Sequence, residues 1–238
     1  MRNVRLAILF CACVCAAQVG GQAKPLPTAN PAVPTISFTF DFPQSSPDHY
    51  SLLVDSAGHA TYVSGLEKEI VPASADGDSN SSSSTVSDEP FHYEFQVSEA
   101  TRARIFDLAA RAHYFEGDLN YTKHSIASTG NKILAYKDGH RSTSATYNYT
   151  TNLPVQQLTT LFQNISATLE FGHRLEYLYR YQKLALDEEM KRMEQMARDN
   201  SLAELQAIAP ILKRILADQS VINVTRARAE RLLAQAGH

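Results

Sequence analysis

The hydrophobic pattern of this chain changes period once, near Pro154, and this change limits the folds open to it. Before Pro154, apolar and polar residues alternate in short runs, which is typical of strands with one buried face. After Pro154, apolar residues recur every three or four positions, which is typical of amphipathic helices. We therefore predict an α+β fold: an antiparallel sheet of about five or six strands with a crossing helix over residues 36–153, followed by a carboxy-terminal helical region over residues 154–238.

The clearest strand pattern lies in residues 36–42, which read Ile-Ser-Phe-Thr-Phe-Asp-Phe and place four large apolar side chains on one face. Residues 50–55 and 59–64 flank a Ser-Ala-Gly turn and predict a hairpin.

Two further features complete the predicted sheet. Residues 91–97 alternate again, and Ser98 is placed to cap the crossing helix. Residues 132–137 and 141–149 flank an Asp-Gly pair, which is a strong local signal for a hairpin.

The helical region begins with an apolar stripe that runs from Pro154 past Gly172 to Ala197. We predict one long helix there, straight or bent near Gly172. Residues 201–204 read Ser-Leu-Ala-Glu, a capping box that predicts the start of the next helix. Pro210 predicts a kink or a new helix start.

A last helix is predicted over residues 220–236. Its charged residues are expected on the exposed face and its two leucines on the inner face: Arg226, Arg228, Glu230 and Arg231 outside, Leu232 and Leu233 inside.

The first 23 residues have the three-part pattern of a secretory signal peptide. Arg2 and Arg5 precede an apolar run, and small residues lead to Ala23. All cysteines of the chain lie in this segment: Cys11, Cys13 and Cys15. We therefore expect an exported protein, periplasmic or extracellular, whose mature form has no disulfide. Residues 24–35 form a Pro-rich leader.

Residues 72–90 contain a serine run and few apolar side chains. Such a segment has little burial to offset the entropy of ordering it, so we predict a disordered loop.

The charge of the chain disfavours two classes of partner. The formal net charge is −3, and removing Arg2 and Arg5 with the signal leaves −5, dispersed along the mature chain. This mild acidity disfavours nucleic acid and anionic lipid. After the signal, no apolar run approaches the roughly 18 residues of a transmembrane helix, so no transmembrane segment is predicted there.

No catalytic, cofactor-binding or metal-binding residue is assigned from the sequence. No two histidines have the His-x-x-x-His spacing of a helical metal site, and the nucleophile-elbow and phosphate-loop patterns are missing. One open alternative is a cross-strand metal site that joins Asp48 and His49 to His59.

The most unusual composition lies in residues 171–181, where tyrosines and arginines alternate within about three helical turns. Tyrosine and arginine are the types that anchor protein interfaces. We interpret this segment as a candidate interface formed by Arg174, Tyr177, Tyr179, Arg180 and Tyr181. The alternative is that the tyrosines surround a helix that is packed on several sides.

Several segments resemble an uncharacterised family of exported proteins from soil bacteria of the acidobacterial kind. They are residues 91–102, 114–118, 170–177 and 209–212. The resemblance implies export, an envelope location and the α+β fold. It implies no activity and no site residues.

Three hypotheses follow from these patterns. The first is a non-enzymatic envelope protein that binds a protein partner or forms a homo-oligomer through its helical region. The second is a small-ligand binder or hydrolase with a pocket between sheet and helices, lined by groups such as His49, His59, Asp118 and His124. The third is a structural element of the cell wall or outer membrane, tethered by the leader if a signal cysteine is lipidated.

Overall fold

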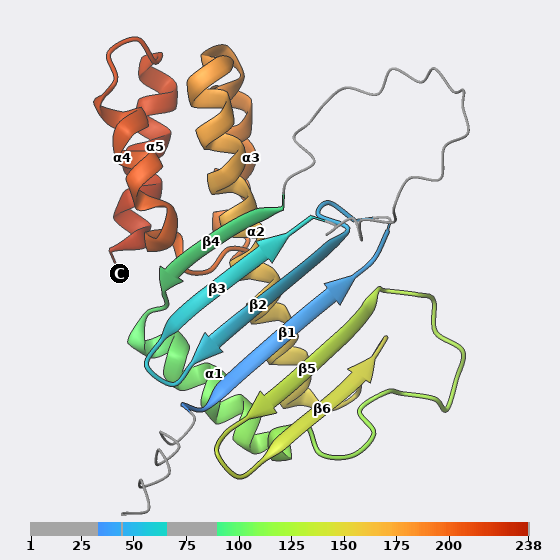
Figure 1. The fold of residues 1–238 in the computed structure, drawn as a ribbon. Coiled ribbons are helices and arrows are strands. Elements are labelled where there is room, and N and C mark those ends of the chain that lie inside the picture. Colours follow the sequence, from blue (N-terminus) through green and yellow to red (C-terminus); the bar gives the residue numbers. More distant parts are fainter. Residues whose placement is uncertain (1–32, 44, 66–89, 238) are drawn as a thin grey trace, which may run out of the picture. The chain divides into compact units, whose positions relative to one another are not determined.

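The computed structural model describes residues 33–43, 45–65 and 90–237, which form a six-stranded antiparallel sheet and five α-helices (Figure 1). The α+β class is therefore confirmed. The sheet order is β4-β3-β2-β1-β5-β6. The strands are β1 Thr35–Asp41, β2 His49–Asp55, β3 His59–Ser64, β4 Phe91–Gln96, β5 Asn131–Lys137 and β6 Ser142–Tyr147. The predicted signal, the leader up to residue 32 and the predicted loop up to residue 89 lie outside the described residues.

The α-helices are α1 Glu99–Arg111, α2 Leu153–Tyr181, α3 Leu186–Arg198, α4 Ala209–Ala217 and α5 Asn223–Ala236. Three short 3₁₀ helices connect them: η1 His113–Phe115, η2 Lys183–Ala185 and η3 Leu205–Ile208. Helices α1 and α2 lie on one face of the sheet (Figure 1). None of the helices in the described ranges has the length and apolar character needed to cross a membrane.

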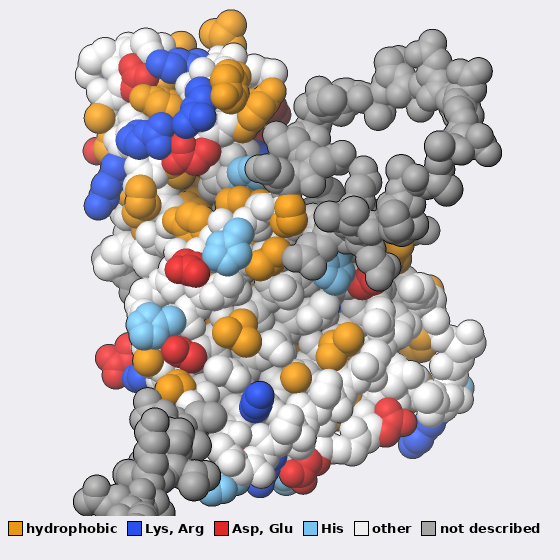
Figure 2. Space-filling view, in the orientation of Figure 1, with side chains coloured by type: hydrophobic (Ala, Val, Ile, Leu, Met, Phe, Trp, Pro, Cys, Tyr) orange, Lys and Arg blue, Asp and Glu red, His pale blue; other side chains and the backbone are white. Residues whose placement is uncertain are grey.

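The strand alternation is confirmed, because the predicted apolar face of each central strand is buried. Ile36 and Phe38 are fully buried, and the ring of Phe38 stacks on Phe162 of α2 with centroids 5.3 Å apart. Burying a side chain of this size contributes about 1.5–3 kcal/mol. The opposite sheet face carries mostly uncharged side chains (Figure 2), including Ser37, Thr39, Ser51, Thr61, Ser144 and Thr146.

Both predicted hairpins are present, and an aspartate closes each turn. Asp55 Oδ1 accepts from the backbone N–H of Ala57 and His59, at 2.9 and 2.8 Å. Asp138 Oδ1 accepts from the backbone N–H of His140 and Arg141, at 2.7 and 2.6 Å. Short polar side chains favour turns for this reason.

The prediction of one long helix after Pro154 is wrong, because the chain reverses at residues 182–185. Helix α2 ends at Tyr181, and α3 runs back along it: Arg174 pairs with Glu189 at 2.6 Å, and Asn164 Nδ2 donates to the carbonyl of Asn200 at 3.1 Å. The connection is about one helical turn long, so the apolar spacing stays in phase and conceals the break.

Gly172 does not interrupt α2, which is helical through this position. The residue is buried, and a Cβ built on it would overlap the Cγ2 methyl of Ile208 in η3. Glycine here lets η3 approach the helix closely.

The capping-box prediction at residues 201–204 is also wrong. No helix begins at Ser201, and Glu204 has a left-handed backbone (φ 60°) before η3. Its carboxylate reaches Ser98, the N-cap of α1, instead. The new helix starts at Ala209, with Pro210 in its first turn as predicted.

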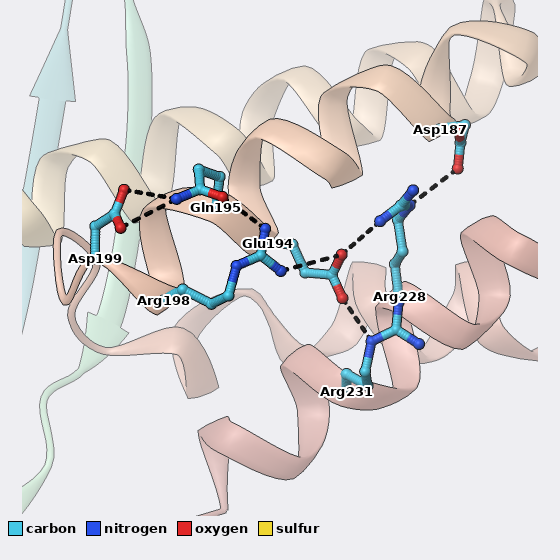
Figure 3. A network of polar contacts seen from close by, with 7 residues as sticks. All are labelled: Asp187, Glu194, Gln195, Arg198, Asp199, Arg228 and Arg231. Carbon is cyan, nitrogen blue, oxygen red and sulfur yellow. Dashed lines mark hydrogen bonds and ion pairs between the residues drawn. The ribbon is translucent and has the colours of Figure 1, made fainter.

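The expected exposed face of α5 requires a correction at Arg228, which is half-buried between helices. Arg228 Nη1 donates to Glu194 Oε2 at 2.5 Å, and its Nε donates to Asp187 at 3.1 Å (Figure 3). Arg231 Nε donates to the other oxygen of Glu194 at 2.5 Å. Arg226 is also half-buried. These contacts join α5 to α3, because two cations of one helix share a buried carboxylate of the other.

Candidate interaction surface

The last turn of α2 exposes a pair of tyrosines. Tyr177 and Tyr181 lie one turn apart, with ring centroids 5.1 Å apart and side chains 53% and 64% exposed. The guanidinium of Arg180 lies 5.8 Å from the ring centre of Tyr181. Leu184 follows in η2 and is 91% exposed. We call Tyr177, Arg180, Tyr181 and Leu184 the α2 tip.

Two of the five predicted interface residues face neighbouring helices instead. Two cations contact the ring of Tyr179: Lys183 Nζ lies 5.0 Å and the Arg214 guanidinium 4.8 Å from its centre. Arg174 pairs with the buried carboxylate of Glu189 and lies over the ring of Phe171. Tyr179 and Arg174 therefore hold α2 to α4 and α3, while Tyr177, Arg180 and Tyr181 point away from them.

An ion pair fixes the turn that carries Leu184. Lys183 Nζ donates to Asp218 Oδ2 at 2.6 Å and contacts Ser220 Oγ at 2.7 Å. The hydrogen bond from Lys183, helped by Ser220, lowers the pKa of Asp218 below its usual range. The turn between α2 and α3 is thus joined to the turn between α4 and α5.

Sequence reasoning missed the contact that links α2 to the sheet edge. His173 stacks on Phe91 of β4, with ring centroids 4.0 Å apart and an interplanar angle of 8°. A cleft of about 80 Å³ lies beside them, and Tyr93, Ile208 and Pro210 also line it. Ligand sites for drug-sized molecules span roughly 300–1,000 Å³, so this cleft suits a single side chain. No local pattern signals the contact, because it joins residues far apart in sequence.

The two strand histidines proposed for a ligand or metal site do not meet. His49 and His59 lie at opposite ends of the β2–β3 hairpin, about 20 Å apart at the rise of a strand. Asp118 lines a polar cleft of about 250 Å³ with Asn120 and Lys123, which neither histidine lines. Within the described ranges, no three His, Cys, Asp or Glu side chains are grouped to hold a metal ion.

A buried polar cluster ties the sheet to α2. The Tyr62 hydroxyl donates to Glu170 Oε1 at 2.8 Å and contacts Ser166 Oγ at 2.9 Å. Ser64 Oγ donates to the same carboxylate oxygen at 2.6 Å. Burial, together with the charge of Glu170, raises the pKa of Tyr62 well above its ordinary value. No imidazole takes part in these bonds, so the arrangement supplies packing and hydrogen bonding between layers.

No protein-family model matches this chain, and no curated protein matches it. The resemblance to exported acidobacterial proteins therefore stays a prediction from the sequence.

Proposed function

We propose that this chain is an exported bacterial envelope protein that acts as a non-enzymatic interaction module and self-associates through the α2 tip. The observation that carries the proposal is the different environment of neighbouring tyrosines. Tyr177 and Tyr181 are more than half exposed, whereas Lys183 and Arg214 contact the ring of Tyr179. Large aromatic side chains left exposed together are typical of contact surfaces.

The chemistry of the tip favours a second copy as its partner. A twofold interface places the same patch against itself, so the patch must be self-complementary. The α2 tip combines tyrosine rings with the guanidinium of Arg180, and an arginine of one copy can lie over a tyrosine of the other. The anchored Lys183–Asp218 pair keeps this surface in place.

The location rests on the signal pattern in residues 1–23. A non-enzymatic role agrees with the separation of His49 from His59. Mass spectrometry of the secreted protein tests the location. A free terminus at Lys24 supports cleavage and export, whereas a lipidated cysteine supports the tethered alternative.

Light scattering coupled to size exclusion tests self-association. We expect the mature protein to be a dimer or larger, and Tyr177→Ser combined with Tyr181→Ser to yield a monomer with unchanged circular dichroism. Leu153→Ser is the matched control, because Leu153 is equally exposed (66%) at the other end of α2 and should leave the mass unchanged. A wild-type monomer at every concentration contradicts the proposal.

A further inference from the structure

Strand β4 is one edge of the sheet and pairs only with β3 among the described strands (Figure 1). The Val97 N–H donates to the Gly58 carbonyl at 3.0 Å, and this bond identifies which backbone groups of β4 face β3. Backbone groups in an antiparallel pair alternate between facing the partner and facing away. The N–H and C=O groups of His92, Glu94 and Gln96 therefore point to the open side of β4.

These outward groups are unpaired within the described part of the chain. No hydrogen bond there involves the backbone N–H or C=O of His92, Glu94 or Gln96. Their side chains are exposed as well. An edge of this kind is a template for another strand, and proteins usually block it with lysine, proline, a bulge or a covering segment. The sequence Phe-His-Tyr-Glu-Phe-Gln contains neither lysine nor proline, and Glu94 is its one acidic residue.

Each edge of the sheet has a neighbouring segment among the described residues. Thr143 of β6 donates to the Tyr114 carbonyl of η1 at 2.5 Å. Just after β6, the Asn148 N–H donates to Asn120 Oδ1, and Asn148 Oδ1 accepts from the Thr129 N–H. The connection between α1 and β5 therefore flanks β6. Residues 204–211 lie beside β4 in the same way, since the Tyr93 hydroxyl donates to the Ala207 carbonyl at 2.7 Å and Glu204 accepts from Ser98, but no described strand pairs with the outward backbone groups of β4.

The inner side of the β4 edge adds an apolar recess. Phe91 and Tyr93 form one wall of the 80 Å³ cleft, and Ile208, Pro210 and Ile211 form another. Side chains of an added strand alternate between the two sheet faces. Side chains of the added strand that lie opposite Phe91 and Tyr93 would point to the sheet face that carries this cleft. The side chain opposite Glu94 would point to the outer face.

We propose that the β4 edge binds an extended segment of a partner polypeptide as a seventh strand. The complement of a row of free N–H and C=O groups is another extended backbone. The partner segment alternates apolar residues, one of which enters the cleft, with polar residues, and it carries a lysine or arginine opposite Glu94. This surface shares no residue with the α2 tip, and the inference does not require self-association.

The test uses a labelled peptide, acetyl-Val-Thr-Val-Lys-Leu-Thr-Val-amide, and fluorescence anisotropy with the mature protein. A control peptide of the same sequence carries methyl groups on the backbone nitrogens of its lysine and its two threonines. It keeps the side chains but loses the backbone N–H donors that face the β4 edge. We expect the N-methylated peptide to bind at least about tenfold more weakly, because each lost bond costs about 0.5–1.5 kcal/mol. Equal binding of the two peptides would overturn the proposal.

Variants locate the site. Glu94→Pro removes one outward N–H without removing a bond to β3, and should weaken binding about tenfold or more. Glu94→Ala keeps the N–H and should weaken binding only about two- to fivefold, through the lost charge pair. Similar losses for both variants would contradict pairing at the edge. If Glu94→Pro does not fold, the N-methylated peptide still decides the question on the wild-type protein.

Two further outcomes separate this proposal from the others. The Tyr177→Ser, Tyr181→Ser variant should bind the peptide as the wild type does, and loss of binding would move the site to the α2 tip. A wild-type dimer that becomes monomeric in Glu94→Pro, with no peptide binding by either form, would show that a second copy occupies the edge and would overturn the inference.

Discussion

The carboxylate of Glu204 accepts two hydrogen bonds from Ser98 across 106 positions of sequence, from the backbone N–H at 2.7 Å and from the hydroxyl at 2.8 Å. Ser98 Oγ in turn accepts from the Thr101 N–H at 3.2 Å and caps α1. In a local capping box, a glutamate three residues after the cap bonds back to its N–H. Here a glutamate from the helical region takes that position, so the start of α1 and the segment before η3 stabilise each other.

Replacing Glu204 should therefore destabilise the protein. We expect Glu204→Ala to lower the free energy of unfolding by about 1–3 kcal/mol, because it leaves the N–H of the half-buried Ser98 without its partner. Urea unfolding followed by circular dichroism measures the change. Ser201→Ala is the control: it should cost less than about 0.5 kcal/mol, since Ser201 caps no helix. A larger loss of stability for Ser201→Ala than for Glu204→Ala would indicate that the two residues form a local capping box.

Gly172→Ala should destabilise the protein although alanine favours helices. Alanine in a helix interior normally gains about 1 kcal/mol over glycine. The new methyl group would overlap Ile208, so we expect a net loss of about 1–3 kcal/mol. In an Ile208→Ala background the loss should shrink or reverse, because the overlapping methyl is gone. A double-mutant cycle of unfolding free energies, measured by thermal or urea denaturation, tests this. If the effects of the two substitutions are additive, this contact is not the cause.

The Glu194 cluster should contribute to stability at neutral pH. Glu194→Gln keeps the shape but removes the charge shared by Arg228 and Arg231, and we expect a loss of about 1–3 kcal/mol in urea unfolding. Glu230→Gln is the matched control, because Glu230 is exposed on α5 and forms no ion pair with any described residue. Equal losses of unfolding free energy for Glu194→Gln and Glu230→Gln would mean that the charge of Glu194 adds no stability.

The same cluster predicts a pH dependence. Burial alone would raise the pKa of Glu194, but the hydrogen bonds and charges of Arg231 and Arg228 outweigh burial and lower it. A carboxyl whose pKa is lower in the folded state stabilises above its unfolded pKa and loses this contribution as pH falls. The wild type should thus exceed Glu194→Gln in unfolding free energy by a constant amount above roughly pH 5. This difference should shrink below that pH. A difference that grows on acidification would contradict this assignment.

Buried tyrosines predict the opposite dependence at alkaline pH. Burial raises the pKa of Tyr147 to about 12, although its hydrogen bond with Thr159 acts against this. A phenol whose pKa is higher in the folded protein stabilises the folded state at pH values below its unfolded pKa of about 10. This contribution is lost as the pH rises toward about 12. We expect Tyr147→Phe to leave the first step of a tyrosinate absorbance titration unchanged and to reduce only the step that accompanies unfolding. A smaller first step would show that Tyr147 is accessible in the folded protein.

The local features of this fold could be predicted, whereas the contacts between distant segments could not. The cap at Ser98 can be predicted because the cap and the alternating strand before it are adjacent in sequence. The role of Glu204 cannot, because its partner Ser98 is distant in sequence. Of the predicted interface residues, Tyr177, Arg180 and Tyr181 are exposed, but Tyr179 is held by Arg214 of another helix. Composition alone cannot tell these tyrosines apart.

The fold class, the strand faces and the hairpin turns can be predicted from sequence, because hydrophobic period and turn chemistry act between residues a few positions apart. The tertiary structure decided where α2 ends and which of its tyrosines face solvent. It also makes β4 an edge strand whose outward backbone groups pair with no other described strand. These features depend on which distant segments come together, and a reversal of about one helical turn at residues 182–185 leaves the apolar spacing in phase. Packing between segments, which periodicity does not encode, therefore positions every surface that we propose for binding.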